Sequence, residues 1–381
     1  MTMTTGVEPP ADQQNPAPPP GSRRWLLFGV SNLVVVVVVS VLSWYLLADP
    51  TSSPWHFYPL PFNAALFWAI LFIVFIGFNS EFVGFDRLGQ PLRGIAVLVS
   101  TAVFAVAVTC CSVADWVRCS PTSPVPAPAA WATSRALFVL FGFGTWVMVV
   151  LNWQHWPWTA LGMKQPLIGL CEIAFVAIPT LALYIVIGLP AVSSSVTNPM
   201  MSLDTVLGWF YSIVVSVILT GQTLDNWPWK LFGGGGKTAL AATIGNALLG
   251  TTIYFVMVPL AKLLVGSQAS AELGNTIHQF PAQIGVCWAF WMIFWANGFG
   301  NRFAPAVRAV LTFVLAVGTF LLYYRFAAGN VLHEPAVASG LAGNALGFVD
   351  WLVLWTLIYV VAFQSMGLRR LVDDPEPADV R

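Results

Sequence analysis

The sequence predicts an all-α integral membrane protein with about ten transmembrane helices. Only 8% of its 381 residues are charged and 57% are hydrophobic, whereas roughly a quarter of the residues in a soluble globular chain are charged. Apolar stretches of at least 18 residues recur along the chain, and each could cross a hydrocarbon core of about 30 Å as a helix. So little charge would not solvate a surface of this size, which leaves lipid as the surrounding solvent.

Short connections rich in proline, glycine and serine separate the apolar segments. The first segment follows Arg23 and Arg24, which allows either a twin-arginine export signal or an uncleaved anchor. It is longer than the apolar region of a signal peptide and no cleavage motif follows it, so the anchor is favoured. The approximate limits of the predicted spans are 25–47, 62–84, 92–113, 131–152, 166–189, 203–224, 238–260, 281–299, 304–326 and 345–366.

The polar residues outside these spans are few, which predicts one transmembrane domain over residues 23–370. Residues 1–22 are rich in proline and glutamine and are expected to form a disordered cytoplasmic tail. Residues 371–381 are expected to form a short cytoplasmic C-terminal tail. Ten spans would place twelve of the 16 lysines and arginines on the side that holds both termini, and four on the other side. This bias predicts a multi-pass protein of the cell (inner) membrane with both termini in the cytoplasm.

A short motif recurs where alternate spans end. The sequence "NWQHWPW" ends at Trp158 and "DNWPW" ends at Trp229, 71 residues later. Steps of 73 residues back and 74 residues forward reach Phe85 and Phe303, and a degraded fifth copy follows the last span. The spacing predicts five tandem two-helix hairpins of about 72 residues, related by an axis along the membrane normal. The tryptophans are typical of the aromatic belt at a membrane surface.

Polar residues stand six positions before each of the four anchors: Asn79, Asn152, Thr223 and Asn297. We place them nearly two turns inside their helices, near the edge of the hydrocarbon. Polar side chains at that depth need partners, which could be one another across helices or a bound ligand. Both interpretations remain open from the sequence.

Ionisable residues within or beside the spans are the other candidates for function. Glu172 is the deepest acid, and it either pairs with a cytoplasmic base or lines a polar cavity. His155 could serve a proton-coupled step beside Glu81 or Asp225, or it could be an ordinary interfacial residue. The candidate substrate-binding residues are therefore Asn79, Glu81, Asn152, His155, Glu172, Thr223, Asp225 and Asn297.

No catalytic residue, metal ligand or cofactor is predicted. The five cysteines include no C-x-x-C pair, and the four histidines are dispersed. Unpaired packing is favoured over a disulfide from Cys119 to Cys110 or Cys111. The sequence "GGGGKT" at 233–238 lacks the first glycine of a phosphate-binding loop, because Leu231 occupies that place.

The leading functional expectation is a permease or secondary transporter for a small neutral or cationic molecule. It predicts that Glu172→Gln abolishes uptake. A non-catalytic scaffold or accessory subunit of a membrane complex is the first alternative, in which Asn152→Leu would only destabilise the protein. A lipid-modifying transferase is the second alternative. The expected partners are the lipid bilayer and a small-molecule substrate but not nucleic acid, and the sequence leaves open a homo-oligomer or a membrane complex.

Overall fold

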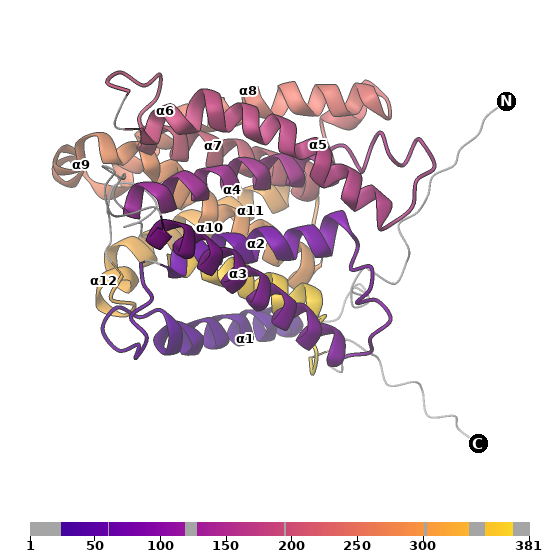
Figure 1. Cartoon of the computed structure of the whole chain (residues 1–381), viewed down its shortest axis with the longest axis horizontal. Coiled ribbons are helices and arrows are strands. Elements are labelled where there is room, and N and C mark those ends of the chain that lie inside the picture. Colours follow the sequence, from indigo (N-terminus) through magenta and orange to yellow (C-terminus); the bar gives the residue numbers. More distant parts are fainter. Residues whose placement is uncertain are drawn as a thin grey trace.

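The computed structural model of the chain describes residues 24–59, 61–118, 128–193, 196–300, 303–334 and 347–368. Within these residues the secondary structure is helical without strands, and the long helices lie side by side with roughly parallel axes (Figure 1). The all-α prediction is therefore confirmed. The α-helices are α1 (Arg24–Leu47), α2 (Phe62–Val74), α3 (Leu92–Arg118), α4 (Pro128–Leu151), α5 (Leu167–Leu183), α6 (Leu189–Val192), α7 (Leu203–Ile218), α8 (Gly236–Val265), α9 (Ser267–Leu273), α10 (Phe280–Phe294), α11 (Pro305–Leu322), α12 (Ala328–Asn330) and α13 (Gly347–Trp355).

Several of these helices continue as a π-helical turn at the C-terminal end. The π-helical segments are η2 (Phe75–Asn79), η3 (Tyr184–Gly188), η4 (Leu219–Thr223), η7 (Trp295–Phe299), η8 (Tyr323–Ala327) and η10 (Thr356–Ala362). Short 3-10 helices, η5 (Trp229–Phe232) and η6 (Gly274–Gln279), lie in two connections. The helices begin and end close to the predicted limits. The sulfur atoms of Cys110, Cys111 and Cys119 lie outside the part of the chain whose side chains are described.

Seven helices in the described residues are long and apolar enough to cross a membrane: Trp25–Leu47, Phe62–Asn79, Leu92–Thr109, Leu167–Val192, Leu203–Thr223, Gly236–Val265 and Pro305–Asn330. Two shorter apolar helices, Leu137–Leu151 and Gly347–Ala362, lie beside them. The chain therefore has the architecture of a membrane-embedded, multi-pass helical protein.

Five helices form a closed inner ring. In the order α2, α4, α7, α10 and α13, each helix packs against the next, and α13 packs against α2. In their most apolar stretches, 61% of the residues of α2 and 83% of those of α7 are buried, against 17–33% in α1, α3, α5, α8 and α11. The inner helices therefore form the core, and the other five expose apolar residues outwards, as lipid-facing helices do.

The outer helices occupy equivalent places around this ring. Each of α3, α5, α8 and α11 packs on the inner helix that precedes it in sequence, and also against the end of the previous ring member. The first helix, α1, fills the fifth place, because it packs on α13 and on the turn η7 that ends α10. The helix α1 therefore occupies the outer place beside α13 and completes the set of five outer helices around the ring.

Tryptophan side chains fasten inner helices to outer ones. Their indole N–H groups donate across the boundary to hydroxyl oxygens, which satisfies two polar groups within an apolar region. The pairs are Trp153 with Thr243, Trp209 with Thr251, Trp288 with Thr312, Trp291 with Thr319, and Trp351 with Ser43, at 2.8–3.1 Å.

One end of the molecule carries a repeated backbone turn. In the turns that follow α2, α4, α7 and α13, two consecutive residues adopt φ of 51–60°. Just before each of these pairs, a backbone N–H at the helix end donates to the carbonyl oxygen of the residue five positions earlier. These bonds satisfy carbonyls that a helix end leaves without partners. The residue pairs are Glu81–Phe82, Gln154–His155, Asp225–Asn226 and Gln364–Ser365. We call this end the motif end; the connections after α2 and α4 lie at the right of Figure 1, and α9 and α12 lie at the opposite end.

The turn corrects the predicted depth of the recurrent polar residues. Asn79 and Thr223 are the last residues of their helices, and Asn152 follows the last residue of α4. The prediction of two further helical turns was wrong, because the left-handed pair ends each helix before the aromatic anchor. The side chains of Asn79, Asn152 and Thr223 therefore lie at the ends of their helices instead of nearly two turns inside them.

The belt interpretation of the tryptophans holds for only part of the motif. Trp227 is 51% exposed, as a belt residue would be, but Trp158 is buried against Val149 and α5. Trp229 packs so closely on α8 that a Cβ added to Gly245 would lie 2.1 Å from its ring. Trp158 and Trp229 therefore hold the turn against the neighbouring outer helix.

Candidate functional site

The eight predicted residues fall into separate joints, where an inner helix end meets an outer helix. The first joint contains Asn79, Glu81, His155 and Glu172, and we call it the Glu172 cluster. The side chain of Glu172 on α5 is fully buried. It accepts a hydrogen bond from Asn79 Nδ2 at 2.7 Å, and its other oxygen lies 2.7 Å from His155 Nδ1. The structure thus places two of the predicted residues, Asn79 and His155, against the carboxylate of a third, Glu172.

The Glu172 cluster reaches the surface through its histidine. His155 Nε2 lies 3.9 Å from Glu81 Oε1, and the Glu81 side chain is 38% exposed. The expected proximity of His155 to Glu81 is therefore present, whereas Glu172 pairs with the imidazole instead of with a lysine or arginine. This arrangement connects a buried carboxylate to an imidazole that contacts the exterior.

The second joint is a closed network around Asn152. Asn152 Nδ2 donates to Thr220 Oγ1 at 3.2 Å and to Asn226 Oδ1 at 3.1 Å. Its Oδ1 accepts from Asn246 Nδ2 at 3.1 Å, and its backbone carbonyl accepts from Asn226 Nδ2. All four side chains are buried. Because each amide group of Asn152 is satisfied by protein, this joint resembles structural packing between α4, α7 and α8.

The third joint is an ion pair. Arg308 on α11 is 3% exposed and donates to Asp225 Oδ2 at 2.8 Å, whereas the Asp225 side chain is 50% exposed. Thr223 is buried nearby in sequence, and its hydroxyl has no partner among the described residues. Asn297 donates to the carbonyl of Ile293 within its own helix. The structure therefore does not join Thr223, Asp225 and Asn297 to the Glu172 cluster.

The centre of the inner ring contains space that the sequence did not reveal. Two cavities are each lined by residues from α2, α4, α7, α10 and α13 or their terminal turns. A cavity with walls from every member of a closed ring lies inside that ring. The smaller, motif-side cavity is lined by Val74, Phe78, Phe143, Val147, Val150, Leu151, Ile218, Gln222, Ile293, Val353 and Leu357.

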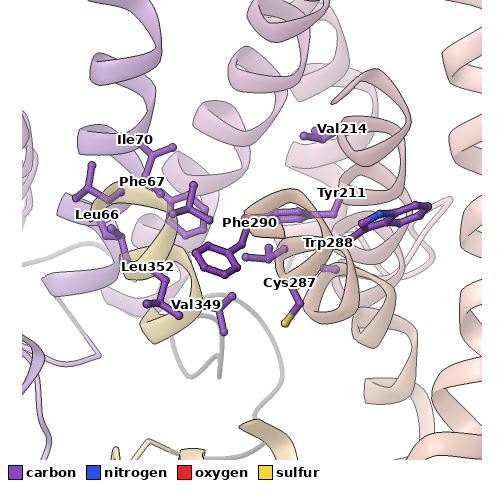
Figure 2. Packing of buried hydrophobic residues seen from close by; sticks show 14 of the residues in the cluster. Leu66, Phe67, Ile70, Tyr211, Val214, Cys287, Trp288, Phe290, Val349 and Leu352 are labelled. Atoms are coloured by element: carbon purple, nitrogen blue, oxygen red, sulfur yellow. The ribbon is translucent and has the colours of Figure 1, made fainter. Parts of the chain in front are cut away.

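The larger cavity lies towards the opposite end, and we call it the Asp350 chamber. Its lining is Phe67, Ile70, Val139, Leu140, Phe143, Tyr211, Val214, Val215, Ile218, Val286, Ala289, Ile293, Asp350 and Val353. Figure 2 shows part of this core, with Tyr211 reaching inwards from α7. Phe143, Ile218, Ile293 and Val353 line both cavities. These four apolar side chains form the constriction between the two cavities.

The opposite end also holds a buried acid that sequence reasoning missed. Glu334 is 1% exposed and accepts hydrogen bonds from Tyr58 at 2.9 Å and Tyr323 at 2.5 Å. Burial raises the pKa of this carboxyl to about 7, against the opposing effect of hydrogen bonds from both tyrosines and from backbone N–H groups. No signal marks it in the sequence, because Tyr58 is 276 positions away.

The pKa of a second acid at this end, Asp49, is shifted in the opposite direction. Asp49 accepts from Thr51, Ser52 and the ring of His333 at 2.6–2.9 Å. Burial acts to raise the pKa of Asp49, but these hydrogen bonds outweigh it and hold that pKa at about 2. Asp49 is thus a fully satisfied anion that ties the connection after α1 to the segment after α12.

No group of three or more histidine, cysteine, aspartate or glutamate side chains in the described part of the chain is placed to hold a metal ion. In the comparisons with known proteins, no family model, no curated protein and no solved structure matches the chain.

Proposed function

We propose that this protein is a membrane permease for a small neutral or cationic molecule, and that the molecule crosses along the axis of the inner ring. The observation that carries the proposal is the pair of cavities inside the ring, both of which are lined by Phe143, Ile218, Ile293 and Val353. Small motions of four apolar side chains would join the two cavities. Such hydrophobic constrictions are a known means of gating.

The proposal includes ten crossings built from five tandem hairpins. The recurrent turns at the motif end and the equivalent places of the outer helices support it. We further propose that the motif end lies on the cytoplasmic side of a cell (inner) membrane, because ten crossings would place twelve of the 16 lysines and arginines on that side. The axis of the ring would then run along the membrane normal, as in transporters with parallel repeats.

The lining narrows the class of molecule. Apolar side chains form nearly the whole wall, so a hydrated ion would lose its water without replacement ligands, a penalty of several kcal/mol for each charge. Small neutral molecules, and cations that find a fixed counter-charge, pay less. The small number of charged side chains along the axis is therefore compatible with both classes of molecule.

A pathway through the Glu172 cluster is the second candidate. It is favoured by the buried carboxylate that meets an imidazole at 2.7 Å, with Glu81 leading outwards. In this alternative the molecule, or a coupled proton, passes between hairpins instead of through the ring. A scaffold role is the third candidate, and the closed hydrogen bonds of Asn152 favour it.

The axial pathway is tested by filling the constriction. Ile218→Trp adds bulk to a residue that lines both cavities, so we expect it to lower solute flux into proteoliposomes at least ten-fold. Methylamine and glycerol are suitable cationic and neutral probes, followed by stopped-flow light scattering. Leu240→Trp on α8 is the matched control, because Leu240 is 63% exposed on the outer surface. The proposal fails if neither probe outpaces protein-free vesicles, or if Ile218→Trp transports like Leu240→Trp.

A further inference from the structure

The Asp350 chamber contains two polar side chains in an otherwise apolar wall. Asp350 lies in the first turn of α13 and Tyr211 lies on α7. They are 5% and 7% exposed, and both line the chamber. Neither side chain has a hydrogen-bond or ion-pair partner among the described residues. A carboxylate and a hydroxyl therefore line this chamber without a hydrogen-bond partner among the described residues.

This lack of partners distinguishes Asp350 from the other buried acids. Glu172 is bonded to Asn79 and His155, and Glu334 is bonded to Tyr58 and Tyr323. The start of a helix favours a nearby negative charge, but that effect is weak compared with the penalty of burying an unpaired carboxylate. Asp350 therefore requires a counter-charge, a proton or a hydrogen-bond donor from outside the described chain.

The surroundings favour a positive ligand. No lysine or arginine lines the chamber. Phe67 and Phe143 add aromatic rings to the wall, whose faces attract cations. A calcium or magnesium ion would need about six oxygen ligands, and the chamber offers one carboxylate and one hydroxyl. An ammonium group needs fewer partners, and its apolar substituent would contact the remaining walls.

We infer that the Asp350 chamber is a binding site for a small protonated amine with an apolar substituent. The ammonium group donates to the Asp350 carboxylate and to the Tyr211 hydroxyl oxygen, and the substituent lies among Phe67, Phe143 and Ile218. The inference deepens the proposed function and rests on it, because the chamber would be the occupied station of the axial pathway.

Direct binding tests the site without requiring transport. Benzylamine is titrated calorimetrically into the purified, detergent-solubilised protein at pH 7, with benzyl alcohol and benzoate as neutral and anionic analogues. We expect benzylamine to bind at least ten-fold more tightly than benzyl alcohol, and benzoate not to bind. Asp350→Asn should weaken benzylamine binding at least ten-fold and remove its preference over the alcohol. Tyr211→Phe should weaken it about three-fold.

Glu272→Gln is the matched control. Glu272 is an exposed acid on α9 at the same end of the molecule, so this change removes an equal charge outside the chamber and should leave binding unaltered. Tyr211→Phe keeps the test decisive if Asp350→Asn does not fold. The inference is overturned if benzylamine and benzyl alcohol bind alike, if no amine binds, or if both chamber variants bind benzylamine like the wild type.

The two proposals fail in different ways. Amine binding that depends on Asp350, without any flux into proteoliposomes, would reject the axial passage and keep the site. Flux that Ile218→Trp blocks, without Asp350-dependent binding, would keep the passage and reject the site.

Discussion

The Asn152 and Glu172 joints at the motif end and the Asp350 chamber differ in how their buried polar side chains are bonded. At the motif end, Asn152 and Glu172 are bonded to neighbouring side chains, and each joint lies between an inner and an outer helix. Towards the opposite end, Asp350 and Tyr211 face a cavity on the axis without partners among the described residues. Groups that protein already satisfies stabilise the fold, whereas unsatisfied groups are available to a ligand. The recurrent Asn152 therefore belongs to a joint, whereas the ligand site that we propose lies at residues that do not recur.

The largest change in stability should come from removing the hydrogen bonds of the Asn152 joint. Asn152→Leu would leave one buried amide atom of each neighbour, Asn226 Oδ1 and Asn246 Nδ2, without its partner, which should lower stability by about 4 kcal/mol. Thermal unfolding in detergent measures this change. Asn330→Leu, at an exposed position on α12, is the matched control and should have little effect. Equal stability of the two variants would show that the Asn152 network is not a structural joint.

A slightly smaller effect should follow from pH at the opposite end. The pKa of Glu334 is about 7 in the folded protein against 4.5 when unfolded, so the native state holds the proton more tightly. Its contribution, about 3 kcal/mol, is fully present below pH 4.5 and is lost as the pH rises through 7. Melting temperatures at pH 5 and pH 8 should differ more in the wild type than in Glu334→Gln. Asp49 does not interfere, because its pKa of about 2 places its contribution at lower pH. Parallel pH profiles of the two proteins would contradict this account.

The smallest predicted change in stability is an increase instead of a loss. Asp350→Asn removes an unpaired buried carboxylate, so we expect it to raise stability by about 1 kcal/mol while it weakens amine binding. The same thermal unfolding assay, without ligand, compares it with Asn152→Leu. A loss of stability in Asp350→Asn would mean that the carboxylate is held by protein groups, and the contrast between the two ends would disappear.

The limits of the described helices were predicted well because polar, proline-rich connections separate long apolar segments in the sequence. The sequence could not predict the ring, since nothing local shows that α1 completes the place beside α13. It also placed Asn79 and Asn152 too deep, because consecutive left-handed residues at Glu81–Phe82 and Gln154–His155 have no strict sequence signature.

The functional candidates were predicted less completely. Glu172 and His155 stood out as polar residues in or beside apolar segments, and they do meet in space. The axial residues Ile218 and Val353 did not stand out, because an apolar side chain beside a cavity looks the same in sequence as one facing lipid. Asp350 was visible as an acid, but Tyr211, 139 positions earlier, is joined to it only by the fold.

The central claim is that molecules cross along the ring axis instead of through the joints between hairpins. It is tested most directly by measuring methylamine flux into proteoliposomes for Ile218→Trp and Glu172→Gln side by side. Ile218 lies at the axial constriction and Glu172 lies in a joint at the motif end. We predict that Ile218→Trp lowers the flux at least ten-fold and that Glu172→Gln retains most of it. Loss of flux in Glu172→Gln with normal flux in Ile218→Trp would contradict the account and place the pathway between the hairpins.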